Sequence, residues 1–166
     1  MVEDVNIKDT LTSVQTQVDA LINFTGGGVN FRAYSLSTET INAGNNLIYE
    51  EEEYDTENSY DIGTGVYTIV IGGTYVFSFG WYVVDESTAV INLIRKRGAT
   101  ETIIQQSTNG TNTDDNTGYF VTTIAECETD DEVYAYVDSG SCRLIPFTPS
   151  NTDNQLTSFS GSRMSN

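Results

Sequence analysis

The sequence predicts an all-β jelly-roll sandwich preceded by a short N-terminal helix. From Val29 onward, short runs rich in Val, Ile, Tyr, Phe and Thr alternate with clusters of Asn, Gly, Asp and Ser, the pattern of short strands joined by turns. No helical pattern alternates with these runs, so a parallel α/β sheet is disfavoured. Before them, apolar residues recur at helical spacing. We therefore expect a helix over residues 1–24, a glycine joint at 25–28 and one β domain over 29–166.

The N-terminal segment carries a heptad seam, with apolar residues at successive intervals of 4, 3, 4 and 3. Leu11 and Val18 fall at a positions and the other three at d positions, so β-branched residues lie mostly at d, which favours trimers or tetramers over dimers. A helix this short is marginal alone, so a coiled-coil neck depends on the domain that follows it. The alternative is one helix packed on its own domain. The predicted trimerisation residues are Ile7, Leu11, Val14, Val18 and Leu21.

Three consecutive glycines, Gly26 to Gly28, end the helical period, because glycine has no side chain to fix the backbone. After them the pattern of apolar runs and turn residues predicts a series of strands. Their predicted ranges are Asn30 to Ser37, Asn46 to Tyr49, Tyr54 to Tyr60, Val66 to Val70, Gly73 to Val84, Ala89 to Arg97, Thr102 to Gln106, Gly118 to Glu126, Glu132 to Asp138, Cys142 to Phe147 and Ser158 to Met164.

The strand predicted from Gly73 is the longest and carries an aromatic stripe. Aromatic residues occupy every second position, so they share one face of the strand, while small and polar residues share the other. Such a stripe can also serve as a sugar-binding platform, but in mid-chain and at strand period it favours the core. The stripe residues are Tyr75, Phe77, Phe79 and Trp81.

Composition excludes several classes of function. With 7 Lys and Arg against 24 Asp and Glu, the net charge is −17, which opposes binding to phosphate backbones and anionic lipid. No stretch has the length and apolarity of a membrane span, so membrane insertion is not expected. The chain contains no His, so catalytic triads and His-ligated zinc are excluded, and no phosphate loop or nucleophile elbow is present. We therefore expect no enzyme activity and assign no certain cofactor.

Three features leave alternatives open. The acidity is typical of halophiles, and equally of an ordinary acidic extracellular surface. Cys127 and Cys142 are 15 residues apart, which fits a hairpin disulfide as well as two reduced thiols. The acidic run from Glu50 to Glu53 predicts a solvated loop, because four like charges repel one another and are not buried unpaired.

Several stretches follow one another in a recognisable order. They are VNFRAYS from Val29, YDIGTGVYT from Tyr60, GGTYVFSF from Gly72, DDEVY from Asp130 and TSFSG from Thr157. This ordered set resembles the globular head of complement component C1q, a trimeric jelly roll related to tumour necrosis factor, over residues 29–164. The chain departs from the family pattern in lacking a proline before Gly72, in carrying Asp130 where a glycine is usual, and in ending its last strand with Ser-Arg-Met.

The resemblance implies a homotrimer and a calcium ion near its apex. In such heads calcium can lie on carboxylates and amides of the loop before the strand that matches Gly118 to Glu126, and calcium prefers oxygen ligands of this kind. In this chain the implied ligands are Gln106, Asp114 and Asp115, and the alternative is an ordinary polar loop. Loops at the end far from the neck are expected to contact partners. The expected contact residues are Asp85, Glu86, Ser87, Asn109 and Asn112.

These observations together predict a non-enzymatic, trimeric structural protein of a virion, namely a spike, fibre head, turret or capsid decoration that acts in host attachment. The basis is the stalk-plus-head layout, the threefold patterning, the lack of a signal-peptide pattern and the acidity, which suggests a halophilic or marine virus. The helix would bind other virion proteins, and the head would bind a cell-surface glycan or protein. The alternative is a secreted, extracellular C1q-domain lectin or pattern-recognition protein. A carbohydrate-active enzyme is disfavoured by the missing His.

Overall fold

The computed structural model describes residues 28–83, 88–109, 117–146 and 157–164, and these contain strands and no helix. The strands are β1 Asn30–Tyr34, β2 Glu39–Asn42, β3 Glu51–Asp55, β4 Tyr60–Asp61, β5 Val66–Thr68, β6 Gly73–Val83, β7 Val90–Arg97, β8 Thr100–Thr108, β9 Gly118–Cys127, β10 Glu132–Ser139, β11 Ser141–Leu144 and β12 Ser158–Arg163. The predicted helix over 1–24 and most of the glycine joint lie outside the described residues.

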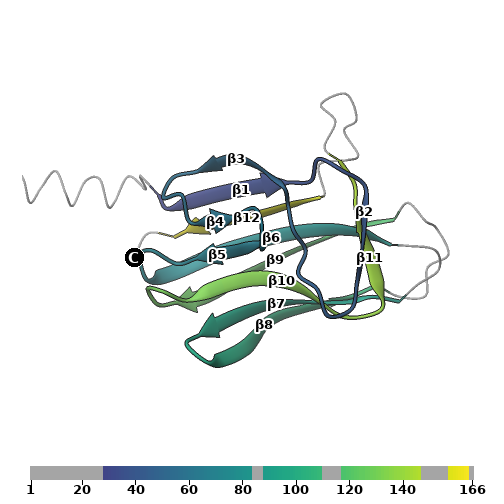
Figure 1. Cartoon of the computed structure of the whole chain (residues 1–166). Helices are drawn as coiled ribbons and strands as arrows, with labels where there is room; N and C mark the ends of the chain where they lie inside the picture. The colour runs from purple at the N-terminus through teal and green to yellow at the C-terminus, as the bar shows by residue number, and fades with distance from the viewer. Residues whose placement is uncertain (1–27, 84–87, 110–116, 147–156, 165–166) are drawn as a thin grey trace, which may run out of the picture.

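Two antiparallel sheets pack face to face, as Figure 1 shows. The first sheet has the order β2-β11-β6-β12-β1-β3, with β9 also paired to β6. The second sheet has the order β4-β5-β10-β7-β8. Neighbouring strands in each sheet come from distant parts of the chain, as when β12 lies between β1 and β6. This arrangement confirms the predicted all-β jelly roll.

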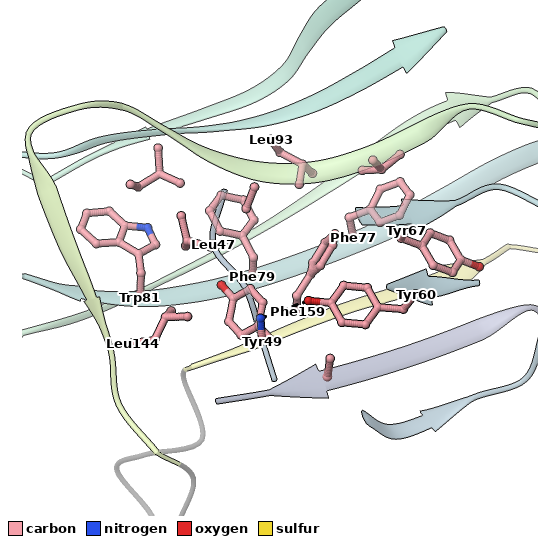
Figure 2. Packing of buried hydrophobic residues seen from close by; sticks show 14 of the residues in the cluster. Leu47, Tyr49, Tyr60, Tyr67, Phe77, Phe79, Trp81, Leu93, Leu144 and Phe159 are labelled. Atoms are coloured by element: carbon pink, nitrogen blue, oxygen red, sulfur yellow. Dashed lines mark hydrogen bonds between the residues drawn. The ribbon is translucent and has the colours of Figure 1, made fainter. Parts of the chain in front are cut away.

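The aromatic stripe on β6 forms the centre of the core. Tyr75, Phe77, Phe79 and Trp81 are all fully buried between the sheets, so the core prediction is confirmed. Figure 2 shows three other aromatic side chains meeting this stripe. They are Tyr49, Tyr67 and Phe159. The core thus consists largely of rings from both sheets, which bury large apolar areas per residue.

The predicted strand from Tyr54 to Tyr60 is wrong, because a turn interrupts it. The side chain of Asp55 accepts hydrogen bonds from the backbone N–H groups of Ser59 (2.5 Å) and Tyr60 (2.6 Å), which folds the chain back between β3 and β4. The predicted strand from Asn46 is also wrong. There the structure has only an isolated bridge between Asn46 and Tyr136.

The prediction that the acidic run forms a loop is wrong. Glu51 to Glu53 form the start of edge strand β3. This strand pairs only with β1 and ends its sheet, and charged side chains on an edge strand oppose pairing with a further strand. Arg32 on β1 lies 2.7 Å from Glu53 across this pair. Glu50 just before β3 accepts hydrogen bonds from the backbone N–H groups of Leu36 (3.0 Å) and Ser37 (3.1 Å). The charges remain solvated, but on a strand.

The two cysteines are free thiols, and the fold explains why. Cys127 pairs with Gly73 at the start of β6, whereas Cys142 pairs with Val83 at its end. Because a strand rises about 3.3 Å per residue, these ends are roughly 30 Å apart, far beyond the reach of a disulfide. Both thiols are buried, and burial raises the pKa of Cys127 to about 11 and that of Cys142 to about 12.

Candidate functional site

The outward face of the first sheet carries almost no charge along its central strands. Because strand side chains alternate, the residues beside the buried rings of β6 point to the outside, as do their partners on β9 and β12. We call this set the uncharged face. It consists of Thr74, Val76, Ser78, Phe120, Thr122, Ile124, Ser160 and Ser162. The one charged partner is Glu126 at the end of β9, where its Oε1 accepts a hydrogen bond of 2.5 Å from the Thr74 hydroxyl. In a chain of net charge −17, a sheet face with so little charge is unusual, and depletion of charge is typical of interface cores.

Two large apolar side chains on β9 stand out from the uncharged face. Ile124 is 62% exposed and Phe120 is 50% exposed, whereas their neighbours Val121 and Ala125 pack against the core. Between them, Thr122 shares a hydrogen bond of 2.8 Å with Ser78 on β6. The face is therefore apolar at β9 and made of small hydroxyl side chains over β6 and β12. Such a surface can be buried against another protein at little cost.

The outward face of the second sheet is hollowed into a cavity of about 600 Å³ over β5, β10, β7 and β8, which we call the basin. Its side chains form cross-strand rows, because β10 and β8 both pair with β7. One row is charged and runs Glu132, Lys96, Glu101. In this row Lys96 Nζ lies 2.7 Å from Glu132 Oε2. The volume lies within the range typical of small-molecule sites.

A buried carboxylate holds the turn between β9 and β10. Asp131 accepts hydrogen bonds from Arg97 Nε and Nη2 (both 2.8 Å) and from the backbone N–H of Glu128 (2.8 Å). These bonds, chiefly those from Arg97, hold the pKa of Asp131 below its usual range. The preceding residue, Asp130, has φ 68°. The left-handed region favours glycine and tolerates Asp, which explains how an acid stands where a glycine is usual.

Of the three implied calcium ligands, one lies among the described residues. Gln106 lies on β8, and its side-chain nitrogen donates a hydrogen bond of 3.0 Å to Asn92 Oδ1. Asp114 and Asp115 lie outside the described residues. Within the part of the chain that the structure describes, no three acidic, Cys or His side chains come together as a metal site. The calcium ion therefore stays a prediction.

The expected contact loops begin and end at one end of the sandwich. The backbone N–H of Val83 donates to the carbonyl of Thr117 (3.1 Å), which brings the ends of these two loops together. Asp85, Glu86, Ser87 and Asn112 lie outside the described residues, as do the five heptad residues from Ile7 to Leu21.

Asn109 requires a correction, because it was expected to be exposed at a contact loop. Its side chain is fully buried, and Asn109 Oδ1 accepts a hydrogen bond of 2.5 Å from the backbone N–H of Ala89. It thus ties the end of β8 to the start of β7. A buried amide with a backbone partner serves stability rather than contact with another molecule.

Sequence reasoning missed both the uncharged face and the basin. The alternate positions of β6 and β9 did carry a signal for the first, because Thr74, Val76 and Ser78 are uncharged in a highly acidic chain. The basin had no comparable signal, since it depends on the register of three strands. Among the described residues, no helix has the length and apolarity needed to cross a membrane.

The comparison with known families matches this fold. The model of the C1q domain matches residues 31–162, which is most of the chain. The chain belongs to the C1q domain family. Two of the motifs that resemble C1q lie side by side in the core. They are the aromatic residues of β6 and the Phe159 and Gly161 of β12. No curated protein matches the sequence.

Solved structures show the same C1q and tumour necrosis factor jelly roll. The globular domain of zebrafish complement 1qA has a TM-score of 0.58 at 14% identity, and the match covers 81% of this chain and 96% of that one. The Eiger TNF of S. frugiperda has a TM-score of 0.67 at 10% identity, covering 82% and 92%. Murine APRIL at pH 5.0 has a TM-score of 0.62 at 6% identity, and the match covers 82% of this chain and 99% of that one. Likeness at these identities establishes the fold.

Proposed function

We propose that this chain is the head of a homotrimeric, non-enzymatic recognition protein, assembled through the uncharged face. The observation that carries the proposal is the exposure of two apolar side chains, Ile124 at 62% and Phe120 at 50%, on a sheet face whose central strands carry almost no charge. A second copy is the occupant that fits, because the family is one of trimeric jelly rolls and a closed ring buries the same face on every protomer. Another class of partner is an outcome of the experiment below.

The charge distribution favours assembly through the uncharged face. Each protomer carries a net charge of −17, so association through any acidic surface is opposed by repulsion. The uncharged face reduces this cost, since its side chains are Ser, Thr, Val, Ile and Phe and only Glu126 adjoins it at the end of β9. Burying the exposed part of Ile124 and Phe120 contributes about 1–2 kcal/mol for each side chain. Small hydroxyl groups let the partner backbone approach closely.

The finer proposal is that the trimer is displayed on a virion surface as a spike, fibre head, turret or capsid decoration that attaches to a host. It rests on the stalk-plus-head layout, the threefold patterning and an acidity suited to a saline environment. Mass spectrometry of purified particles from the source of the gene tests it. Detection of the chain at a fixed ratio to the capsid protein is the expected result, and its absence overturns the virion assignment.

The second candidate is a secreted, extracellular C1q-domain recognition protein, which the C1q family membership favours. It shares the trimer and the recognition role but not the particle. A secretory leader in the full gene, with the chain recovered from culture medium or body fluid, decides for this candidate over the virion one.

The trimer is tested by placing a charge on the uncharged face. We expect Ile124→Asp to turn the trimer into a monomer that keeps its β-sheet circular dichroism, measured by sedimentation equilibrium. The carboxylate would be buried without a partner in the trimer, so the association constant falls by about two orders of magnitude or more. The matched control is Ile62→Asp, because Ile62 is 48% exposed in the turn between β4 and β5. The control should stay trimeric, and an Ile124→Asp protein that stays trimeric refutes the interface.

A further inference from the structure

The basin on the second sheet contains two engaged pairs of polar groups. Lys96 is neutralised by Glu132 at 2.7 Å, and Tyr134 Oη donates to Glu101 Oε1 at 2.8 Å. Tyr134 is on β10 and Glu101 is on β8, with β7 between them. The tyrosine side chain therefore lies across β7 to make this bond. The pairs form a charged rim and a ring-lined floor.

Three other polar groups line the basin without a partner among the described residues. Asn92 is only 2% exposed, and its Oδ1 accepts from Gln106, but its side-chain N–H groups donate to no described atom. The nitrogen is not one of the fully enclosed polar atoms without a partner in the described part of the chain, so it opens onto the basin. On the neighbouring strand β10, the Tyr136 hydroxyl and the Asp138 carboxylate make no described hydrogen bond. The basin therefore presents a donor, a hydroxyl that donates or accepts, and an acceptor.

The middle of the basin is apolar. Ile94 on β7 faces Tyr134 on β10 and Ile103 on β8, so one row of the floor carries no unpaired polar group. Ile103 is 53% exposed at the edge. An apolar floor beside unpaired donors and acceptors suits a ligand with one apolar and one polar side.

We propose that the basin binds a neutral sugar residue. The C–H face of a pyranose would pack on the row of Ile94, Tyr134 and Ile103, and its hydroxyl groups would bond to Asn92 and Asp138. Each sugar hydroxyl both donates and accepts, which matches the mixture of unpaired groups. Anionic ligands are disfavoured, because the basin holds three carboxylates and one Lys. A cation would leave the Asn92 donor unpaired.

The inference names the class of ligand for the proposed recognition function, and it rests on that function only for the role that sugar binding would serve. The basin lies on the second sheet of one protomer, whereas the uncharged face lies on the first. Sugar binding and trimer formation are therefore tested separately. The monomeric Ile124→Asp protein should bind the same sugar in the basin of its chain as the wild type does.

The experiment begins with a glycan array carrying neutral, sialylated and sulfated glycans. Titrations of the intact protein with the methyl glycosides of glucose, galactose, mannose and N-acetylglucosamine follow, monitored by NMR. We expect preference for neutral glycans and a dissociation constant of about 1 mM or below for at least one glycoside. Binding only to anionic glycans, or no binding to any neutral glycan, overturns the proposal.

Variants then locate the binding. Asn92→Asp keeps the shape and the acceptor for Gln106 but removes the unpaired donor, so we expect affinity to fall about tenfold or more. Because the new carboxylate lies at a position only 2% exposed, circular dichroism must first show that the variant is folded at the temperature of the titration. The matched control Asn58→Asp makes the same change in the exposed turn between β3 and β4, and it should bind normally. Sugar binding unaffected by Asn92→Asp refutes the site. Spermidine that binds the wild type and binds Asn92→Asp more tightly would identify a cation site instead.

Failure of this proposal is distinguishable from failure of the trimer. A monomeric wild-type protein whose sugar binding depends on Asn92 overturns the trimer and supports the basin. A trimer whose sugar binding does not depend on Asn92 overturns the basin and supports the trimer.

Discussion

Replacing Gly161 by Ala should destabilise the core, because this glycine lies between two buried rings. In the register of the first sheet, Gly161 pairs with Phe31 on one side and Phe77 on the other. A methyl group there would lie 2.5 Å from Phe31 Cε1 and 2.9 Å from Phe77 Cδ1. Ordinary carbon contacts need about 3.5–4.0 Å, so both rings would have to move by roughly 1 Å.

The magnitude follows from the burial of the rings. Both rings are fully enclosed, and neither can relax into solvent. Overpacking a well-packed core costs about 1–3 kcal/mol, and a clash with two rings places Gly161→Ala near 3 kcal/mol. For a chain of this size, each kcal/mol shifts Tm by about 2–4 °C. We therefore expect a decrease in Tm of roughly 6–12 °C.

Differential scanning calorimetry and urea unfolding measure this change. Gly63→Ala is the matched control, because its new methyl group would meet only the exposed Asp61 side chain, at 3.2 Å, without a positive φ. The control should change the free energy of unfolding by less than about 1 kcal/mol. If Gly161→Ala melts at the wild-type temperature, the packing of Phe31 and Phe77 around this position is wrong.

Two further predictions concern the acid and thiol groups. Asp131→Asn should lower the free energy of unfolding at pH 7. Because Arg97 depresses the pKa of Asp131 in the folded state, its stabilisation is fully present above the unfolded pKa of about 3.9 and is lost as pH falls from there through the lower folded pKa, so the difference in urea unfolding between the two proteins should begin to shrink below about pH 4. A difference that does not shrink as pH falls from about 4 to about 2.5 would contradict this reasoning. Cys127 and Cys142 should resist iodoacetamide at pH 8 in the folded protein, because burial raises both pKa values, and mass spectrometry should find both alkylated only in denaturant. A Tm that falls on adding reductant would indicate a disulfide.

The sequence predicted the parts of the fold that depend on local period. The aromatic residues of β6 recur at every second position, so their burial on one face followed directly from strand geometry. The position of the acidic run was harder, because Glu51 and Glu52 have low strand propensity and their strand exists only through pairing with β1. Asn109 shows the same limit, since a polar residue at a strand end can be solvated or buried against a backbone donor.

The basin was beyond sequence reasoning because its rows depend on register. Tyr136 and Asn92 are 44 residues apart in sequence, and they are neighbours only because β10 pairs with β7 as it does. The register of β8 against β7 also shifts between Leu93 and Ile94, which no local pattern indicates. By contrast, the uncharged face lies on the alternate positions of a strand that the sequence had already predicted.

The mass of the wild-type chain in solution tests the central claim of a trimer most directly. Size-exclusion chromatography with light scattering should be run in dilute buffer and in molar salt. The account predicts a mass three times the 18.2 kDa of the chain, most robust in molar salt because salt screens the repulsion between acidic protomers. A mass of 18.2 kDa under both conditions would contradict the trimer and show that the uncharged face is not an interface between copies.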